Sequence, residues 1–248
     1  MSDHDLHHDH TEEAIATRLA SAREQSYLGD AVLGAMDGTV TTFACVAAVA
    51  GAGLGAGASA AFGLASLLAD GFSMAVGNYF RAKADEEVVD QVRRMEEDHI
   101  DKVPEGEREE IRHIFRKKGF DGEILERIVE VITKDRQHWV DTMVTEEWGL
   151  KLETQDPVKA AISTYAAFVL AGSVPLIPLF FLFDASTKTA FLASGLGTLL
   201  TFFGIGYWKG IVLAAPRIRS GFETLVLGSG AAGIAYGIGK MTQSWIGI

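Results

Sequence analysis

The chain has 248 residues and an acidic balance, with 33 Asp and Glu against 22 Lys and Arg and a formal net charge of −11. This excess of negative charge argues against nucleic acid as a partner. The single cysteine, Cys45, lies inside an apolar run, which excludes a disulfide framework and a cysteine-rich metal site. No basic segment followed by a short apolar stretch opens the sequence, so no cleaved signal peptide is predicted.

Most charged residues lie in one stretch, residues 81–156, which we call the charged island. It holds 22 of the 33 acidic residues and 14 of the 22 basic ones. A bilayer imposes such segregation, because a charged side chain in hydrocarbon costs several kcal/mol. Beyond residue 30 and outside the island, only four acids remain: Asp37, Asp70, Asp184 and Glu223.

Residues 1–29 are predicted to form a cytoplasmic tail and an amphipathic helix. Four of the seven histidines stand in the tail at irregular spacing: His4, His7, His8 and His10. We interpret them as part of a disordered tail, with a weak metal-gathering arm as the alternative. Residues 11–27 are expected to form the helix and to lie along the membrane surface.

Apolar runs of about 20 residues, the length that a spanning helix needs, occur five times. They cover residues 31–55, 58–80, 158–183, 189–213 and 222–246. Pro175 and Pro178 predict a kink in the third run. Glycines four residues apart, such as Gly34 and Gly38, predict close contact between helices.

The distribution of Lys and Arg predicts the orientation. These residues precede the first run, fill the island and follow the fourth run, so the positive-inside rule places those three segments in the cytoplasm. The predicted fold is therefore all-α: a five-span transmembrane helical bundle with a cytoplasmic helical metal-binding domain between spans 2 and 3. Residues 30–80 form the first two spans, 81–156 the domain and 157–248 the last three spans. Without organelle signals, we expect a bacterial inner membrane.

The island is predicted to be helical throughout. Residues 81–101 continue the second span, Pro104 resets the chain, and further helices follow over 105–118, 121–133 and 135–148. Gly119 and Gly149 are the expected helix stops. The predicted shared core consists of Ile111, Ile114, Phe115, Ile124, Ile128, Val131, Ile132, Trp139 and Val140.

Three pairs of ligand-type residues stand at helical spacing in the island: Glu96 with His99, Glu107 with Glu110, and Met143 with Glu147. Residues three or four apart share one helix face, so three such pairs on adjacent helices can direct oxygen, nitrogen and sulfur at a common centre. Carboxylates suit divalent cations, while imidazole and thioether shift the preference toward transition metals. The pattern predicts a metal site, whereas other island acids are interpreted as a solvated face: Glu86, Glu87, Asp98 and Glu109.

Two carboxylates lie inside apolar runs, Asp37 in the first and Asp70 in the second, where an ionisable residue is functional by default. Met74 follows Asp70 by four residues and shares its helix face, which predicts a transient stop for a metal ion. Asn78 and Tyr79 follow toward the cytoplasm and are expected to help in handing ions over. A carboxylate that exchanges a cation for a proton couples the two movements.

Four segments are typical of one family: LGDAVLGAMDGTVTTFA at 28–44, LLADGFSMAVGNYF at 67–80, VPEGEREEIRHIF at 103–115 and DTMVTEEWGL at 141–150. The chain resembles the vacuolar iron transporter family over nearly its whole length. The resemblance implies a homodimer of five-span subunits. It also implies that a cytoplasmic domain collects divalent iron and that a pathway by the dimer interface passes the ion out against protons.

The resemblance also implies roles for single residues. Carried over by position, the cytoplasmic ligands are Glu96, Glu107, Glu110, Met143 and Glu147, with His99 in place of a further carboxylate. In the membrane, Asp37 and Met74 match pathway residues. A glutamate expected eight residues before Met74 is Ser66 here, and Asp70, one turn onward, is its expected substitute. The predicted partners are Fe²⁺ or Mn²⁺, protons, lipid and a second copy, with no prosthetic group.

The competing interpretation is an enzyme. Glu96-x-x-His99, Glu110-x-x-His113 and Asp135-x-x-His138 are similar to the Glu-x-x-His element of di-iron carboxylate bundles, which a membrane-anchored ferroxidase would use. The helices predicted after Pro104 are short for such a bundle, and an enzyme would leave the intramembrane aspartates unused. A purely structural membrane protein, a third interpretation, predicts no metal dependence. We therefore predict an exporter of divalent iron, or manganese, by proton antiport.

Overall fold

The computed structural model describes residues 11–16, 27–182, 186–212 and 215–246, and all regular secondary structure in these residues is helical. The N-terminal histidines and residues 17–26 of the expected amphipathic helix lie outside the described residues. The described chain divides into two compact units. The polar unit contains residues 82–155, and the membrane unit contains residues 27–81 and 156–246.

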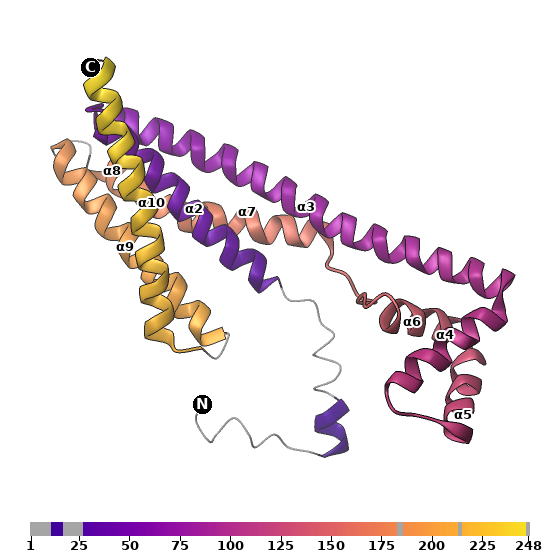
Figure 1. The fold of residues 1–248 in the computed structure, drawn as a ribbon. Helices are drawn as coiled ribbons and strands as arrows, with labels where there is room; N and C mark the ends of the chain where they lie inside the picture. The colour runs from indigo at the N-terminus through magenta and orange to yellow at the C-terminus, as the bar shows by residue number, and fades with distance from the viewer. Residues whose placement is uncertain (1–10, 17–26, 183–185, 213–214, 247–248) are drawn as a thin grey trace. The chain divides into compact units, whose positions relative to one another are not determined.

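Long apolar helices build the membrane unit (Figure 1). They are α2 (Leu28–Gly51), the first half of α3 (Ala56–Lys102), α7 (Pro157–Ser173), α8 (Ile177–Phe181), α9 (Thr187–Val212) and α10 (Arg217–Ile246). Among the described residues, four helical segments are long and apolar enough to cross a membrane: Leu28–Gly51, Ala56–Lys102, Pro157–Phe181 and Lys188–Ile211. The chain is therefore an integral membrane protein. The fifth expected span falls in α10, which has 30 residues but is not among these four.

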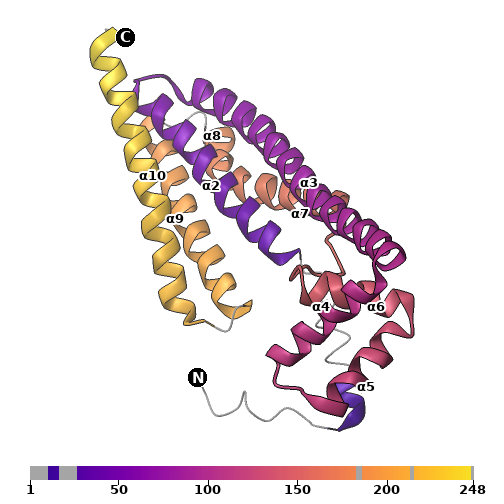
Figure 2. The same ribbon diagram turned by 45° about the vertical axis from the view of Figure 1, so that its right-hand side comes forward.

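Helix α2 is the centre of the membrane unit, because it packs against α7, α9 and α10 (Figures 1 and 2). Its contact with α7 is made by backbone atoms. A Cβ at Gly34 would collide with the carbonyl oxygen of Thr164, and one at Gly38 with that of Phe168. The close helix contact predicted from these two glycines is confirmed.

The third predicted span is interrupted where its two prolines lie. Helix α7 ends at Ser173, a 3₁₀ turn η2 follows at Val174–Leu176, and α8 begins at Ile177. Proline has no amide hydrogen and clashes with the preceding turn, so the helix is kinked or broken at Pro175 and Pro178. The carbonyl of Pro175 accepts a hydrogen bond from the Ser194 hydroxyl of α9 at 2.5 Å. The predicted kink is confirmed.

The polar unit contains the second half of α3 together with α4 (Pro104–Lys117), α5 (Gly122–Thr133) and α6 (Arg136–Glu146). Helix α3 ends at Lys102, before Pro104, which then occupies the first turn of α4. Gly119 and Gly149 have φ angles of +96° and +66°, and only glycine adopts this conformation at little cost. These helices agree with the prediction to within a few residues.

The core of the polar unit differs in part from the prediction. Ile111, Ile132, Trp139 and Val140 are buried as expected, with further side chains from α3, α5 and α6: Val89, Val92, Ile100, Val129, Met143 and Val144. The prediction was wrong for two residues of α5, because Ile124 and Val131 are 65% and 55% exposed, whereas Ile128 packs against the core. Helix α5 carries two apolar faces, and the face of Leu125, Val129 and Ile132 is the one that turns inward.

Candidate metal site and ion pathway

Helices α3 and α4 bring together three of the predicted ligand residues. Glu96 and His99 stand one turn apart on α3, and Glu107 lies in the first turn of α4, directly after the bend at Pro104. One ligand-capable atom from each of the three residues lies within 4.8 Å of the others. The Nδ1 atom of His99 is 3.3 Å from Oε1 of Glu107. This spacing allows one ion to contact all three side chains.

Both carboxylates of this group are buried. Glu96 is 1% exposed and Glu107 is 2% exposed. The indole nitrogen of Trp148 donates a hydrogen bond to Oε1 of Glu96 at 2.8 Å. The other oxygens, Oε2 of Glu96 and Oε2 of Glu107, are buried, and neither receives a hydrogen bond from a donor within the described residues while both groups are ionised. A proton on Glu107 allows the two carboxyl groups to hydrogen-bond to each other. A buried carboxylate oxygen without a partner is costly, so this place favours a proton or a cation.

The pKa values of two acids in this region respond to this environment. Burial, followed by the negative charges of Glu110 and Glu96, raises the pKa of Glu107 to about 8. Burial and the same two neighbours raise the pKa of Glu147 to about 7, while His99 acts in the opposite direction. At neutral pH Glu107 therefore keeps a proton when no metal is bound. A metal ion that binds Glu107 must displace this proton.

The other predicted ligands, Glu110, Met143 and Glu147, are not part of this three-residue group. Glu110 and Glu147 are exposed as whole residues, although the protein around the Glu147 carboxyl still desolvates it, and the charges of both act on Glu107, so they border the same group. Met143 is fully buried in the apolar core of the polar unit. Three of the acids interpreted as a solvated face form surface ion pairs with a basic residue of their own helix: Glu86 with Lys83, Asp98 with Lys102 and Glu109 with Arg112.

The predicted pathway residues lie on α2 and α3 of the membrane unit. Asp37 is half-buried and lies close enough to Asp70 for their charges to interact. Asp70 is exposed and accepts a hydrogen bond from the Ser66 hydroxyl at 2.5 Å. The serine in the glutamate position therefore contacts the aspartate expected to replace that glutamate. Met74 is half-buried and packs against the core of the unit.

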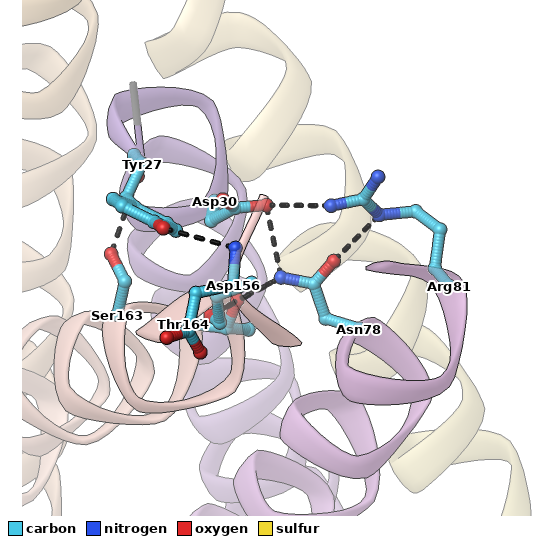
Figure 3. A network of polar contacts seen from close by, with 8 residues as sticks. Tyr27, Asp30, Asn78, Arg81, Asp156, Ser163 and Thr164 are labelled. Atoms are coloured by element: carbon cyan, nitrogen blue, oxygen red, sulfur yellow. Dashed lines mark hydrogen bonds and ion pairs between the residues drawn. The ribbon is translucent and has the colours of Figure 1, made fainter. Parts of the chain in front are cut away.

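Sequence reasoning missed two sets of polar contacts. Trp148 lies 52 residues from Glu96, and no local pattern indicates their hydrogen bond. Asp30 was not among the acids singled out from the sequence, although it is buried in the first turn of α2. Its partners Asn78 and Arg81 lie on α3, and the network that they form is shown in Figure 3.

The fold and the two groups of side chains define a multi-pass membrane protein with a carboxylate and histidine cluster on the polar half of α3 and on α4. The sequence model of the VIT family matches residues 28–240, and the chain belongs to this family. The resemblance predicted from the motifs is confirmed.

Individual relatives match over most of their length. Vacuolar iron transporter 1 of Arabidopsis thaliana is 32% identical over 217 residues, which cover 86% of this chain and 85% of the relative. The protein of the same name from Tulipa gesneriana is 32% identical over 216 residues, or 87% of each chain. The vacuolar iron transporter of Toxoplasma gondii is 31% identical over 229 residues, which cover 89% of this chain and 76% of the relative.

These relatives are named as transporters, and this chain is accordingly a transporter rather than an enzyme. They are named as vacuolar and come from eukaryotes. The bacterial inner membrane predicted from the sequence therefore finds no support among them.

Proposed function

We propose that the protein exports divalent iron from the cytoplasm, with Mn²⁺ as a second ion, in exchange for protons. The observation that carries the proposal is the pair of buried carboxyl groups of Glu96 and Glu107 beside His99, with one ligand-capable atom of each within 4.8 Å of the others. Relatives named vacuolar iron transporters support iron as the cargo.

The polar unit collects the ion in this proposal. Glu96, His99 and Glu107 are its first ligands, and three further residues complete the set: Glu110, Met143 and Glu147. Oxygen, nitrogen and sulfur donors together favour a transition metal over Ca²⁺ or Mg²⁺. Because Glu107 holds a proton near neutral pH, metal binding releases a proton at this site.

The membrane unit carries the ion along Asp37, Asp70 and Met74. Asp70 is exposed on a helix of spanning length, where a charged side chain facing lipid is costly. We therefore place a second copy of the chain against this surface, which makes the protein a homodimer with the pathway at its interface. Protonation of Asp37 or Asp70 and binding of the ion exclude one another, and this exclusion couples the ion to protons.

Five spans complete the proposed topology. Helix α10, with 30 residues, is long enough to be the fifth span. The N-terminus and residues 81–156 then lie in the cytoplasm and Ile248 on the far side. A reporter fused after Ile248 should be active only outside the cytoplasm, and one inserted beside Gly119 only inside. Cytoplasmic activity of the Ile248 fusion would contradict the five-span topology.

Transport into proteoliposomes tests the function directly. We expect uptake of labelled Fe²⁺ and Mn²⁺ that depends on an imposed pH gradient and collapses when an ionophore removes that gradient. Replacing Glu107 and Glu110 by alanine should weaken metal binding by the solubilised chain, whereas the matched pair Glu86 and Glu87 should have no such effect. Uptake that is equal with and without the gradient would rule out antiport.

A further inference from the structure

Side chains of three helices meet in a polar network within the membrane unit (Figure 3). The Asn78 amide nitrogen of α3 donates to Oδ1 of Asp30 on α2 at 2.9 Å and to the Thr164 hydroxyl on α7 at 2.7 Å. The Nε of Arg81 donates to the Asn78 amide oxygen at 2.7 Å. A second guanidinium nitrogen of Arg81 lies 3.5 Å from Oδ1 of Asp30.

The two charged members of the network differ in their access to water. The side chain of Asp30 is 10% exposed, whereas that of Arg81 is 48% exposed. Figure 3 shows the Arg81 guanidinium pointing toward Asp30 beside Asn78. Asp30 therefore needs a positive or hydrogen-bonding partner where it stands, because burying a charge without one is costly. Arg81 can turn into water without that cost.

The network lies at one end of two rows of predicted pathway residues. Asp30 and Asp37 are seven residues apart on α2, which places them on the same face about 10 Å apart. On α3, Asn78, Met74 and Asp70 follow at four-residue steps and also share a face. The charges of Asp37 and Asp70 interact, so each row leads from the network toward one of these two carboxylates.

We propose that Asp30 is a further binding site for the divalent ion, a loading site before Asp37, and that Arg81 occupies it as a tethered cation while no ion is present. The proposal builds on the transport function proposed above. An arriving ion displaces the guanidinium from Asp30, and Arg81 turns outward into water. Asp30 thus has a positive partner before, during and after loading. The Asn78 amide oxygen, which accepts from Arg81 as Asp30 pairs with it, is a further hard ligand for an ion that replaces the guanidinium.

Arg81 could make the same contacts in a purely structural role, as a fixed latch that holds α2 and α3 together. Transport kinetics distinguish this latch role from the role of a tethered cation that competes with the ion. If Arg81 competes with the ion, Arg81→Gln lowers the KM for Mn²⁺ uptake about two- to fivefold, the range of an ion pair with one exposed partner. Asp30→Asn keeps an oxygen that can accept the Asn78 hydrogen bond but removes the charge. We expect it to lower the maximal uptake rate about tenfold or more.

The double variant Asp30→Asn, Arg81→Gln provides the decisive comparison, because a competitor has no effect once its carboxylate is gone. We expect it to match Asp30→Asn in KM. Arg81→Lys keeps the cation and should keep the KM within about twofold of the wild type. Arg127→Gln, which removes an exposed arginine paired with Glu130 on α5, is the matched control and should leave the KM unchanged.

Three results would overturn the loading site: an unchanged or raised KM in Arg81→Gln, an equal effect of Arg81→Gln with and without Asp30→Asn, or an Arg81→Gln variant that no longer assembles. The last result would mark Arg81 as a latch. If the wild type itself moved no Mn²⁺, the proposed function would fail. A transporting wild type with an unchanged KM in Arg81→Gln would count against the loading site alone.

Discussion

Replacing Glu107 by glutamine keeps the shape of the side chain and removes its ability to ionise. In the wild type this side chain is 2% exposed, and in the ionised form its Oε2 has no donor within the described residues. Burial and the nearby charges of Glu110 and Glu96 raise its pKa from 4.5 to about 8. We therefore expect Glu107→Gln to stabilise the metal-free polar unit and at the same time to weaken its metal binding.

The sign of this stability change depends on pH. An unfolded chain releases the Glu107 proton near pH 4.5, whereas the folded chain holds it until about pH 8. The stability from this proton is complete below pH 4.5 and is lost as the pH rises through 8. The full pKa difference corresponds to at most about 5 kcal/mol. Because Glu110 is exposed and its charge is screened, we expect about 1–3 kcal/mol.

Hydrogen exchange of the solubilised, metal-free chain measures this effect locally. The opening free energy of peptides from α4 and α6 should fall between pH 5 and pH 8.5 in the wild type. In Glu107→Gln the decrease in opening free energy over this pH range should be about half of the wild-type decrease or less. The raised pKa of Glu147 accounts for the decrease that remains. Mn²⁺ binding should weaken at least tenfold. Glu109→Gln removes an exposed charge from the same helix and should change neither quantity appreciably.

A Glu107→Gln protein that is less stable than the wild type at pH 8.5 would refute this reasoning. So would a wild type whose α4 stability does not change with pH, because the raised pKa requires that change.

Further predictions concern other parts of the molecule. Trp148→Phe removes the indole donor to Glu96 and should weaken metal binding about tenfold, measured by titration of the solubilised chain; an unchanged affinity would exclude a positioning role. Asp37→Asn should abolish ion uptake into proteoliposomes while metal binding by the polar unit stays intact, and wild-type uptake would remove Asp37 from the pathway. Met74→Ala should slow uptake or change its preference between Fe²⁺ and Mn²⁺ without stopping it, as competition uptake would show. Gly34→Ala should lower the thermal midpoint, because its Cβ would collide with the Thr164 carbonyl, whereas Gly57→Ala, with no atom in reach, should not.

The helices of this protein could be predicted because their signals are local. Proline and glycine mark helix boundaries through their own backbone geometry, as Pro104, Gly119 and Gly149 do here. An apolar run of spanning length is likewise recognised as a membrane helix without tertiary information. The same holds for Glu96 and His99, which share a helix face by spacing alone.

Contacts between distant segments could not be predicted in this way. The burial of Asp30 depends on Asn78, 48 residues away, and the orientation of Glu96 depends on Trp148. The choice between the two apolar faces of α5 is likewise made by packing, since Ile124 and Leu125 are equally apolar. Sequence patterns indicated the type of ligand, and tertiary packing determines which oxygens stay unsatisfied.

The glycine contact between α2 and α7 limits how the protein can move. At Gly34, Gly38 and Gly172 the two backbones touch without intervening side chains. Sliding of packed helices depends on small side-chain adjustments at the contact, and this contact has no side chains that could adjust. The two helices therefore behave as a single mechanical element. Asp37 travels with α7 as well as with α2, and any rearrangement that opens the pathway has to come from α3, α9 or α10 moving against this pair.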